Sequence, residues 1–467
     1  MTNRQQSMGT ATGSVRGEAT RRRVLAGGAS LAAGGALAAC GVAGSGGGEA
    51  AYSSKPPVNI EYLTSLTQRQ VDNKQQLLIE PFERAQPKIK LTVTDWGTFP
   101  EKLISLITAG TPPDVTWFAY PEEYLGKLVQ DITPYVKRDK YSTSPWPKVL
   151  FEAICTWRGK IIGLPNKGGG NWPVLPYNKE LFKQAGVPEP SAKWGDSSWN
   201  ADTFLVALQK TTRRGADGKA ISYGLAQLGA GFIIYNYPGQ WNAAWLTDDY
   251  KTVVCDSAQM VEAYEYLVNL VTKHKVMLLS SQIRDELGES NATNAFLNGK
   301  LAIIQASAAT TATIATAVKD QKLPIAYAPL PLFKTVNAAV NIDDNGLPTG
   351  AKHPEEAWAF VKWSADTPNW SISRGTPVSR ADLFDAWVRE LYPPEVARDM
   401  RFDVFREAYQ NSKKLEPLTN LPGYSDLYKN TIGPAFEKMW AGQAGVAQAL
   451  KEIKPAIQNF VPKELPN

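Results

Sequence analysis

The chain has 467 residues, of which 43% are hydrophobic and 20% are charged, and its formal net charge is +5. Its length is sufficient for two folded domains. Five arginines and one glutamate lie in residues 1–39, so the rest of the chain is close to neutral, at about +1. A near-neutral body with dispersed charges excludes the basic surface of a nucleic-acid-binding protein, and we expect no nucleic-acid partner.

The N-terminal segment combines basic residues with a short apolar run. Residues 20–40 read TRRRVLAGGASLAAGGALAAC, and the Ala- and Gly-rich run over 24–39 is shorter than the ~20 strongly apolar residues of a membrane-spanning helix. The basic lead, the short run and the small residues before a cut point predict an export signal over residues 1–39. The pair Arg21 and Arg22 indicates the twin-arginine route, with a Sec signal as the alternative.

Cys40 directly follows this segment. Residues 37–40 read LAAC and resemble the bacterial lipoprotein box, in which cleavage leaves the cysteine as a lipidated N-terminus. Residues 40–56 are rich in Gly and Ser and predict a flexible linker. We therefore expect an exported, extracytoplasmic protein whose folded part begins near residue 57 and which is held at the cell membrane by a lipid anchor only.

From residue 58 onward, predicted strands alternate with predicted helices. Alternating or continuous apolar residues predict strands over 58–63, 89–93 and 114–118, and helical spacing predicts helices over 77–85 and 99–107. This β-α-β-α-β order predicts an α/β fold with a mostly parallel sheet and helices on its faces.

Further elements follow along the chain. Apolar periodicity predicts helices over 260–271, 357–361 and 446–457, and a strand over 301–304. Asp256 or Ser257 is expected to cap the first of these helices, and Asn178 the helix that carries Leu181 and Phe182.

Seven segments in a fixed order carry a more specific signal. They are AGTPPDVTWF (109–118), GKIIGLP (159–165), PYNKELFKQAGVPEP (176–190), AFLNGKLAII (295–304), KHPEEAWAFVKW (352–363), RGTPVSR (374–380) and MWAGQAGVAQALKEIKPAIQ (439–458). The set spans nearly the whole mature chain and resembles the extracytoplasmic solute-binding proteins of bacterial ABC importers, the sugar-binding family that includes maltose-binding protein. These motifs are specific for the family and not for the ligand.

The resemblance implies the two-lobed α/β fold of periplasmic binding proteins, with three interlobe crossings and a central ligand cleft. Lobe one would comprise residues 57–171 and 332–374, and lobe two residues 172–331 and 375–467. The crossings would lie near residues 171–177, 328–332 and 374–377. The implied function is that of a monomer which closes its cleft around a carbohydrate and delivers it to the permease subunits of an ABC importer.

Candidate ligand contacts come from the aromatic residues. A sugar presents apolar faces and a rim of hydroxyls, so its site needs aromatic rings flanked by polar side chains. Candidates that follow predicted strands or crossings are Trp96, Trp117, Tyr120, Asn171, Trp172, Tyr235, Trp245 and Tyr424. Trp96, Trp172 and Tyr424 occupy the cleft positions that the resemblance implies, with core packing as the alternative for each.

Two segments depart from the family pattern. Residues 305–317 read QASAATTATIATA, without the Gly and the aromatic residue that many relatives have there, and residues 337–339 read NAA in place of paired glycines. Ser307 and Thr310 could offer hydroxyls instead, although small polar residues at a helix start are commonly caps. The identity of the sugar therefore stays open.

An exported lipoprotein glycoside hydrolase is the alternative function. The acidic pairs that could serve it are Glu122-Glu123, Asp248-Asp249 and Asp343-Asp344. Adjacent acids are usually solvated residues of loops or helix starts, and their separation in space cannot be taken from the sequence. We therefore expect no catalytic residue among them.

Other chemistry-bearing residues are sparse. The histidines His274 and His353 have no Cys or carboxylate at metal-ligand spacing, and NKGGGNW (166–172) lacks the ending of a nucleotide-binding loop. Cys155 and Cys255 could form a disulfide, but we expect two buried thiols because they belong to different predicted lobes. Neither a metal nor a cofactor is expected.

Overall fold

The computed structural model describes residues 56–465 except 170–171, 230–231 and 322. The predicted export segment, with Arg21, Arg22 and Cys40, and the predicted site residue Asn171 lie outside the described residues. Within the described part of the chain, no helix is both long enough and apolar enough to cross a membrane.

Two large sheets form the framework, and the first contains the N-terminal strands. Its strands lie in the order β2 (Ile89–Asp95), β1 (Val58–Thr64), β3 (Val115–Trp117), β13 (Ile342–Gly346) and β6 (Leu164–Gly168). β1 is parallel to β2 and β3, whereas β13 is antiparallel to β3 and β6. The three predicted strands are confirmed, and the sheet is mostly parallel as predicted: β1, β2, β3 and β6 run in one direction, and β13, which enters from a distant part of the chain, runs against them.

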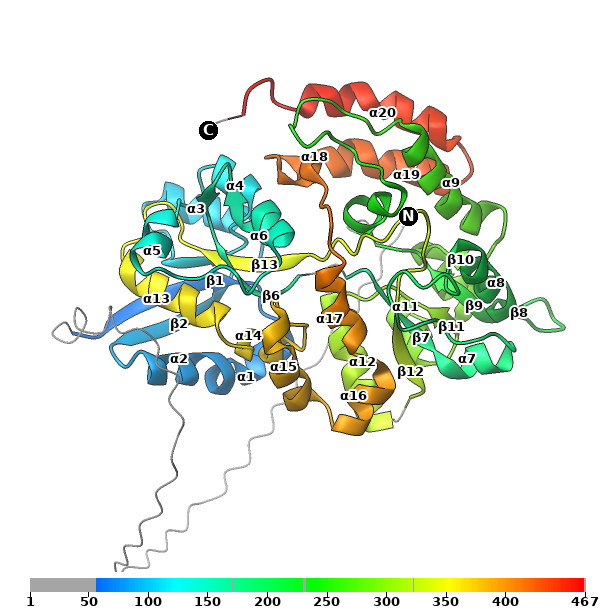
Figure 1. Cartoon of the computed structure of the whole chain (residues 1–467), viewed down its shortest axis with the longest axis horizontal. Helices are drawn as coiled ribbons and strands as arrows, with labels where there is room; N and C mark the ends of the chain where they lie inside the picture. The colour runs from blue at the N-terminus through cyan, green and yellow to red at the C-terminus, as the bar shows by residue number, and fades with distance from the viewer. Residues whose placement is uncertain (1–55, 170–171, 230–231, 322, 466–467) are drawn as a thin grey trace, which may run out of the picture. The chain divides into compact units, whose positions relative to one another are not determined.

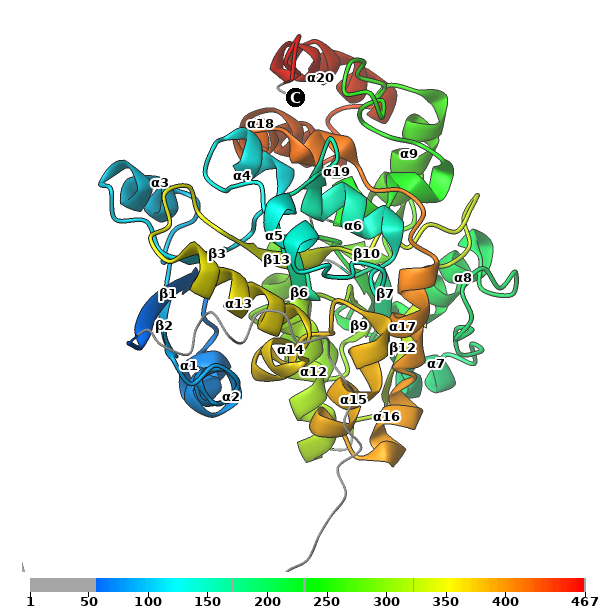
Figure 2. The same ribbon diagram turned by 60° about the vertical axis from the view of Figure 1, so that its left-hand side comes forward.

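Helices cover both faces of this sheet, and we call the sheet and its helices lobe one. Figure 1 and Figure 2 show α4 (Pro121–Leu125), α5 (Thr133–Arg138) and α6 (Lys148–Cys155) on one side, and α1 (Gln68–Lys74), α2 (Glu80–Ala85), α13 (Pro354–Ala365) and α14 (Asn369–Arg374) on the other. A chain of ring contacts joins Phe82, Phe360, Tyr62 and Trp370 in the core between the sheet and the second group.

The second sheet, with its helices, is called lobe two. Its strands lie in the order β10 (Met277–Leu278), β9 (Ala220–Ala226), β11 (Leu301–Ile303), β7 (Val174–Asn178) and β12 (Ile325–Pro329), with β8 (Arg213–Arg214) paired to β9. β9 is parallel to β10 and β11, whereas β7 is antiparallel to β11 and β12. In each five-stranded order four strands therefore run in one direction, and one strand, β13 in lobe one and β7 in lobe two, runs against them.

The remaining elements complete the two lobes. They are η2 (Gln75–Ile79), α3 (Glu101–Thr108), β4 (Thr156–Trp157), β5 (Lys160–Ile161), α7 (Lys179–Gln184), α8 (Ala201–Thr211), η3 (Phe232–Asn236), η4 (Pro238–Trp241), α9 (Ala258–Thr272), η5 (Ser280–Gln282), α10 (Ile283–Leu287), α11 (Ala292–Leu297), α12 (Ala308–Gln321), η6 (Ala381–Leu383), α15 (Phe384–Leu391), α16 (Pro394–Met400), α17 (Asp403–Gln410), η7 (Pro417–Asn420), α18 (Tyr424–Leu427), η8 (Tyr428–Ile432), α19 (Gly433–Trp440) and α20 (Val446–Phe460).

The predicted caps and thiols agree with the structure. Ser257 caps α9 by accepting a hydrogen bond from the N–H of Met260, and Asn178 caps α7 in the same way. Ser307 accepts from the N–H of Thr310 at the start of α12, so its hydroxyl acts as a cap. Cys155 and Cys255 are both buried and free, which confirms two buried thiols.

Three passages of chain connect the lobes, and they are hydrogen-bonded to one another. The first follows β6, the second leads into β13 and the third follows α14. The N–H of Gly168 donates to the carbonyl oxygen of Pro377 at 2.7 Å, and that of Gly169 donates to Asn341 at 2.8 Å. A Cβ at Gly168 or Gly169 would overlap Trp172 or Asn341, so these glycines allow the three passages to approach closely.

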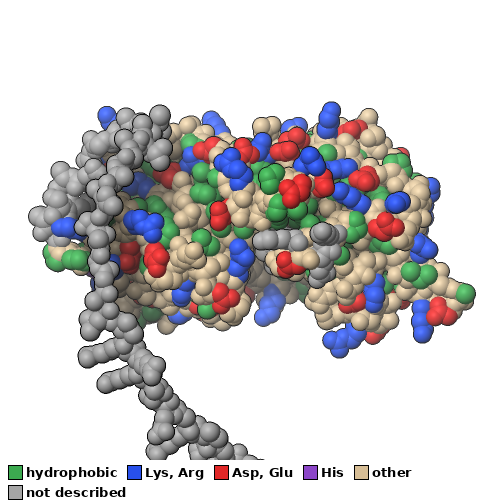
Figure 3. Space-filling view, turned by 90° about the horizontal axis from the view of Figure 1, so that it is seen from below, with side chains coloured by type: hydrophobic (Ala, Val, Ile, Leu, Met, Phe, Trp, Pro, Cys, Tyr) green, Lys and Arg blue, Asp and Glu red, His purple; other side chains and the backbone are tan. Residues whose placement is uncertain are grey.

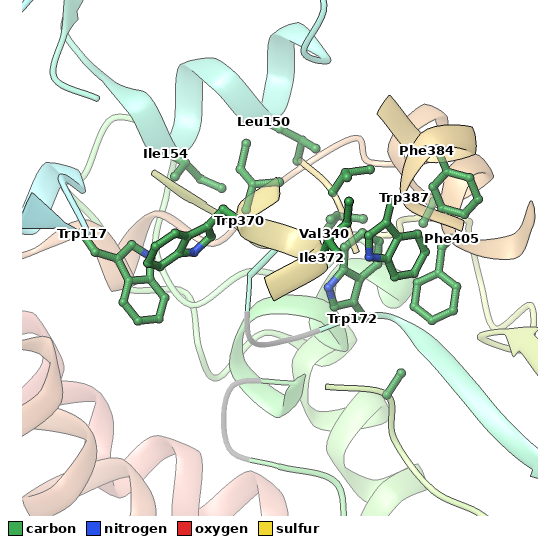
Figure 4. Close-up of a cluster of buried hydrophobic side chains, with 14 of the residues drawn as sticks. Trp117, Leu150, Ile154, Trp172, Val340, Trp370, Ile372, Phe384, Trp387 and Phe405 are labelled. Carbon is green, nitrogen blue, oxygen red and sulfur yellow. The ribbon is translucent and has the colours of Figure 1, made fainter. Parts of the chain in front are cut away.

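Trp172 belongs to the core beside these passages. Its side chain is fully buried, its indole N–H donates to the carbonyl oxygen of Gly169 at 3.1 Å, and its ring meets the rings of Phe405 and Tyr409 edge-on. Figure 4 shows it beside Trp387, with Trp117 at the other end of the same buried cluster. Its environment is that of a packing residue.

Lobe one contains two buried acids, Asp344 on β13 and Glu123 on α4. Asp344 is fully buried, and its Oδ1 accepts a hydrogen bond from the N–H of Ala119 at 2.9 Å. Burial raises the pKa of Asp344 to about 8 and the pKa of the buried Glu123 well above its usual value. Asp344 is therefore largely protonated at neutral pH, and the expectation that these acids are solvated is wrong for Asp343, Asp344 and Glu123.

We predict that Trp172→Ala lowers the free energy of unfolding by about 3–5 kcal/mol, because it removes a fully buried ring and leaves a cavity. Denaturant unfolding measures this difference. Tyr424→Ala, at a partly buried position, is the control and should cost much less. A Trp172→Ala protein as stable as the parent would show that the ring does not stabilise this core.

We also predict that stability decreases as the pH rises from about 4 toward 8, because the folded chain keeps protons on Asp344 and Glu123 that the unfolded chain releases. Asp344→Asn should flatten the slope of unfolding free energy against pH by about 1.4 kcal/mol per unit. Unfolding between about pH 5 and 7 tests this. The exposed Asp72→Asn is the control; an unaltered slope in Asp344→Asn would refute the assignment.

Candidate ligand-binding site

The carboxyl ends of four strands of lobe one meet at one edge of its sheet. β1, β2, β3 and β6 end there, and β13 begins there. The residues at this edge that carry aromatic or charged groups are Trp96, Trp117, Phe118, Tyr120, Lys167, Asp343 and, at the end of α14, Arg374. We call these seven residues the strand-end cluster. In α/β proteins ligands bind at this end of the parallel strands.

The aromatic members of the cluster are stacked. The rings of Trp96 and Trp117 lie 4.9 Å apart at an interplanar angle of 6°, and Phe118 lies 4.2 Å from Trp117 and 5.0 Å from Tyr120. The structure therefore brings together three predicted site residues, Trp96, Trp117 and Tyr120. Phe118 was not predicted as a site residue, but it joins them and is partly exposed. Its position directly after Trp117, at a strand end, could have indicated it.

The charged members surround Trp117. The Nζ atom of Lys167 lies 4.2 Å from the centre of the Trp117 ring, and the Cζ atom of Arg374 lies 4.8 Å from it. Lys167 forms a buried ion pair with Asp343, and the Tyr120 hydroxyl donates to the same carboxylate at 2.5 Å. Lys167 and Arg374 were not selected from the sequence, and Asp343 was named only as part of an acidic pair, because the contacts of these residues join segments far apart in the chain.

Burial lowers the pKa of both cations, Lys167 and Arg374. It lowers the pKa of Lys167 to about 8, against the opposing attraction of Asp343, and it also lowers the pKa of Arg374. A desolvated cation is more costly than a hydrated one unless an anion or a π-system faces it. Trp117 and Asp343 supply such partners for Lys167.

The other predicted site residues lie elsewhere. Trp172 packs in the core described above. Trp245 is fully buried in lobe two, where its indole N–H donates to the hydroxyl of Tyr264 at 3.1 Å. Tyr235 lies in η3, and Tyr424 is the partly buried first residue of α18. The structure does not bring Trp172 or Trp245 into the strand-end cluster.

Contacts between the lobes bring Tyr424 toward the N-terminus of α4. A carboxylate oxygen of Glu122 accepts a hydrogen bond from the N–H of Gly423 at 3.1 Å, and burial raises the pKa of Glu122 to about 7. The side-chain amide of Asn420 donates to the carbonyl oxygen of Ala153 at 3.3 Å. Because Glu122 follows Tyr120 by two residues, this contact lies beside the strand-end cluster.

In the described ranges, no group of three or more His, Cys, Asp or Glu side chains could hold a metal ion. His353, at the N-terminus of α13, contacts Asp114, with its Nδ1 atom 3.0 Å from Oδ1 of Asp114. This pair joins α13 to the segment that precedes β3.

The sequence matches a known family over most of this framework. Residues 67–369 match the family of bacterial extracellular solute-binding proteins. A putative binding protein from Brucella abortus (strain 2308) is 26% identical over 234 residues, which cover 44% of this chain and 54% of that protein. The chain thus matches about half the length of these curated relatives.

Solved structures extend the likeness. The ABC substrate-binding protein from Listeria monocytogenes in complex with cycloalternan is 22% identical, with a TM-score of 0.64 over 86% of this chain and 98% of that one. The sugar-binding protein MalE from Xanthomonas citri is 16% identical, with a TM-score of 0.67 over 86% and 97%. The predicted two-lobed fold is confirmed, and the chain belongs to the family of bacterial extracellular solute-binding proteins.

Proposed function

We propose that this protein captures a carbohydrate between its two lobes and delivers it to the membrane permease of an ABC importer. The observation that carries the proposal is the strand-end cluster, in which aromatic rings and charged groups meet at the edge of lobe one next to the interlobe contact. Two similar proteins support it by their descriptions, one solved with cycloalternan and one called sugar-binding.

The proposed contacts follow from the chemistry of a sugar. Its apolar face would lie against the partly exposed rings of Phe118 and Tyr120 and the small accessible edge of Trp96, which is 8% exposed. Its hydroxyls would bond to polar groups around these rings. Tyr424 would approach from lobe two. Closure of the lobes would bury the ligand and present a surface that the permease distinguishes from the open form. We expect a monomer that needs no cofactor.

The family does not support the glycoside hydrolase alternative, because its members bind solutes. Among the acidic pairs, Asp248 and Asp249 are exposed in a loop, whereas Asp343 and Asp344 lie on one strand and face different partners. Two catalytic carboxyl groups of a glycosidase must instead face one bond from opposite sides. Incubation with oligosaccharides should therefore yield no products.

Binding itself is tested by calorimetry against neutral and acidic mono- and oligosaccharides. We expect a ligand that binds stoichiometrically, raises the melting temperature and reduces the radius of gyration in solution scattering.

Trp96→Ala should weaken binding by about 1–3 kcal/mol, if stacking on sugar resembles stacking on bases. Trp363→Ala, on α13 outside the cluster, is the matched control. Binding without any change in scattering would contradict closure, and failure of all sugars would contradict the proposed function.

We further propose export through the signal of residues 1–39, by the twin-arginine route through Arg21 and Arg22, and anchoring through lipidated Cys40. Cys40→Ser should release the protein from the membrane fraction, because no thiol remains to carry the lipid. Cell fractionation and immunoblotting measure this, with Cys155→Ser as the control cysteine. A Cys40→Ser protein that is processed and still found with membranes would refute the anchor.

A further inference from the structure

The strand-end cluster contains one positive charge that its own carboxylate does not balance. Lys167 is paired with Asp343. Arg374 donates through Nη1 to the carbonyl oxygen of Ser65 and to Oε1 of Gln70, both at 3.0 Å, and these acceptors are neutral. Over the described residues, no Asp or Glu forms an ion pair with Arg374.

Two hydrogen bonds hold the guanidinium of the partly exposed Arg374 in place. Gln70 is fully buried, and its amide nitrogen donates to the hydroxyl of Ser373, so the acceptor is itself fixed. The other support is the ring of Trp117, 4.8 Å from Cζ. Arg374 is partly exposed, so part of the residue meets solvent at this edge.

The neighbouring carboxylates are engaged elsewhere. Asp343 accepts from Lys167 and Tyr120, Asp95 accepts from the N–H of Leu66 at 3.3 Å, and Glu122 accepts from the N–H of Gly423. Burial lowers the pKa of Arg374, and the negative charge of Asp343, which Lys167 already engages, opposes that shift only in part. The charges on the exposed surface differ from that of Arg374, because on the face in Figure 3 basic and acidic side chains lie near one another.

We infer that the site takes an anionic carbohydrate, a sugar that bears a carboxylate or phosphate group, and that Arg374 binds this group. The inference rests on the proposed function and names its ligand class. A guanidinium presents parallel N–H donors that match both anions, and the apolar rings of Trp96, Trp117 and Phe118 strengthen the charge interaction by excluding water.

Calorimetry with matched sugar pairs tests the inference. The pairs are D-galacturonate with D-galactose, and D-glucose 6-phosphate with D-glucose; the two arms distinguish carboxylate from phosphate. In at least one pair the acidic member should bind roughly ten- to a hundredfold more tightly, as expected for charge-assisted hydrogen bonds, and added salt should reduce the difference.

Arg374→Gln should abolish this preference. Arg380→Gln is the matched control, because Arg380 also lies over a tryptophan ring, 5.2 Å from Trp146, but is paired with Asp366 and Asp382. If Arg374→Gln unfolds, Arg374→Lys is the second variant. It keeps the positive charge but lacks the parallel N–H donors of the guanidinium, so it should retain a weaker preference. A preference that survives in Arg374→Gln, or neutral sugars that bind as tightly as acidic ones, overturns the inference and leaves the proposed function intact. Binding of no sugar at all overturns both.

Discussion

The buried ion pair between Lys167 and Asp343 is the interaction on which the strand-end cluster depends. It joins β6, the last strand before the first passage between the lobes, to β13, the first strand after the second passage. Loss of either partner would leave an uncompensated charge in the interior. The pairing of these two strands and the arrangement of the cluster therefore depend on the same contact. Adjacent strand residues face opposite sides of a sheet, which places Asp343 on Lys167 and Asp344 on Ala119.

The same strands determine where the lobes can move. Gly168 and Gly169 continue from β6 and bond to Pro377 and Asn341 of the other two passages. The glycines that superficially suggest a phosphate-binding loop in NKGGGNW thus allow close contact between backbone segments. Since the passages are bonded at the end of the strand that carries Lys167, the connection between the lobes and the charged site share one structural element.

Much of the framework could be predicted from local sequence. Helix caps such as Asn178 and Ser257, and the strands up to residue 118, depend on neighbouring residues and agree with the structure. Trp96 and Trp117 were selected because they lie at predicted strand ends, and the structure places both in the strand-end cluster. Trp172 has a similar position in the sequence, but its ring turns into the core against Phe405. The positions of Lys167 and Arg374 in the cluster could not be predicted, and Asp343 was named only as part of an acidic pair, because their contacts join segments far apart in the sequence.

The position of Arg374 links selectivity to closure. While water reaches its guanidinium, neutral acceptors from Ser65 and Gln70 are sufficient. When lobes close around a solute, that water is removed, and a charge without a counter-ion becomes costly in the resulting apolar surroundings. A neutral solute leaves this cost in place, whereas an anionic one removes it. Selection in such a site arises as much from the penalty of closing over the wrong solute as from the strength of contacts with the right one.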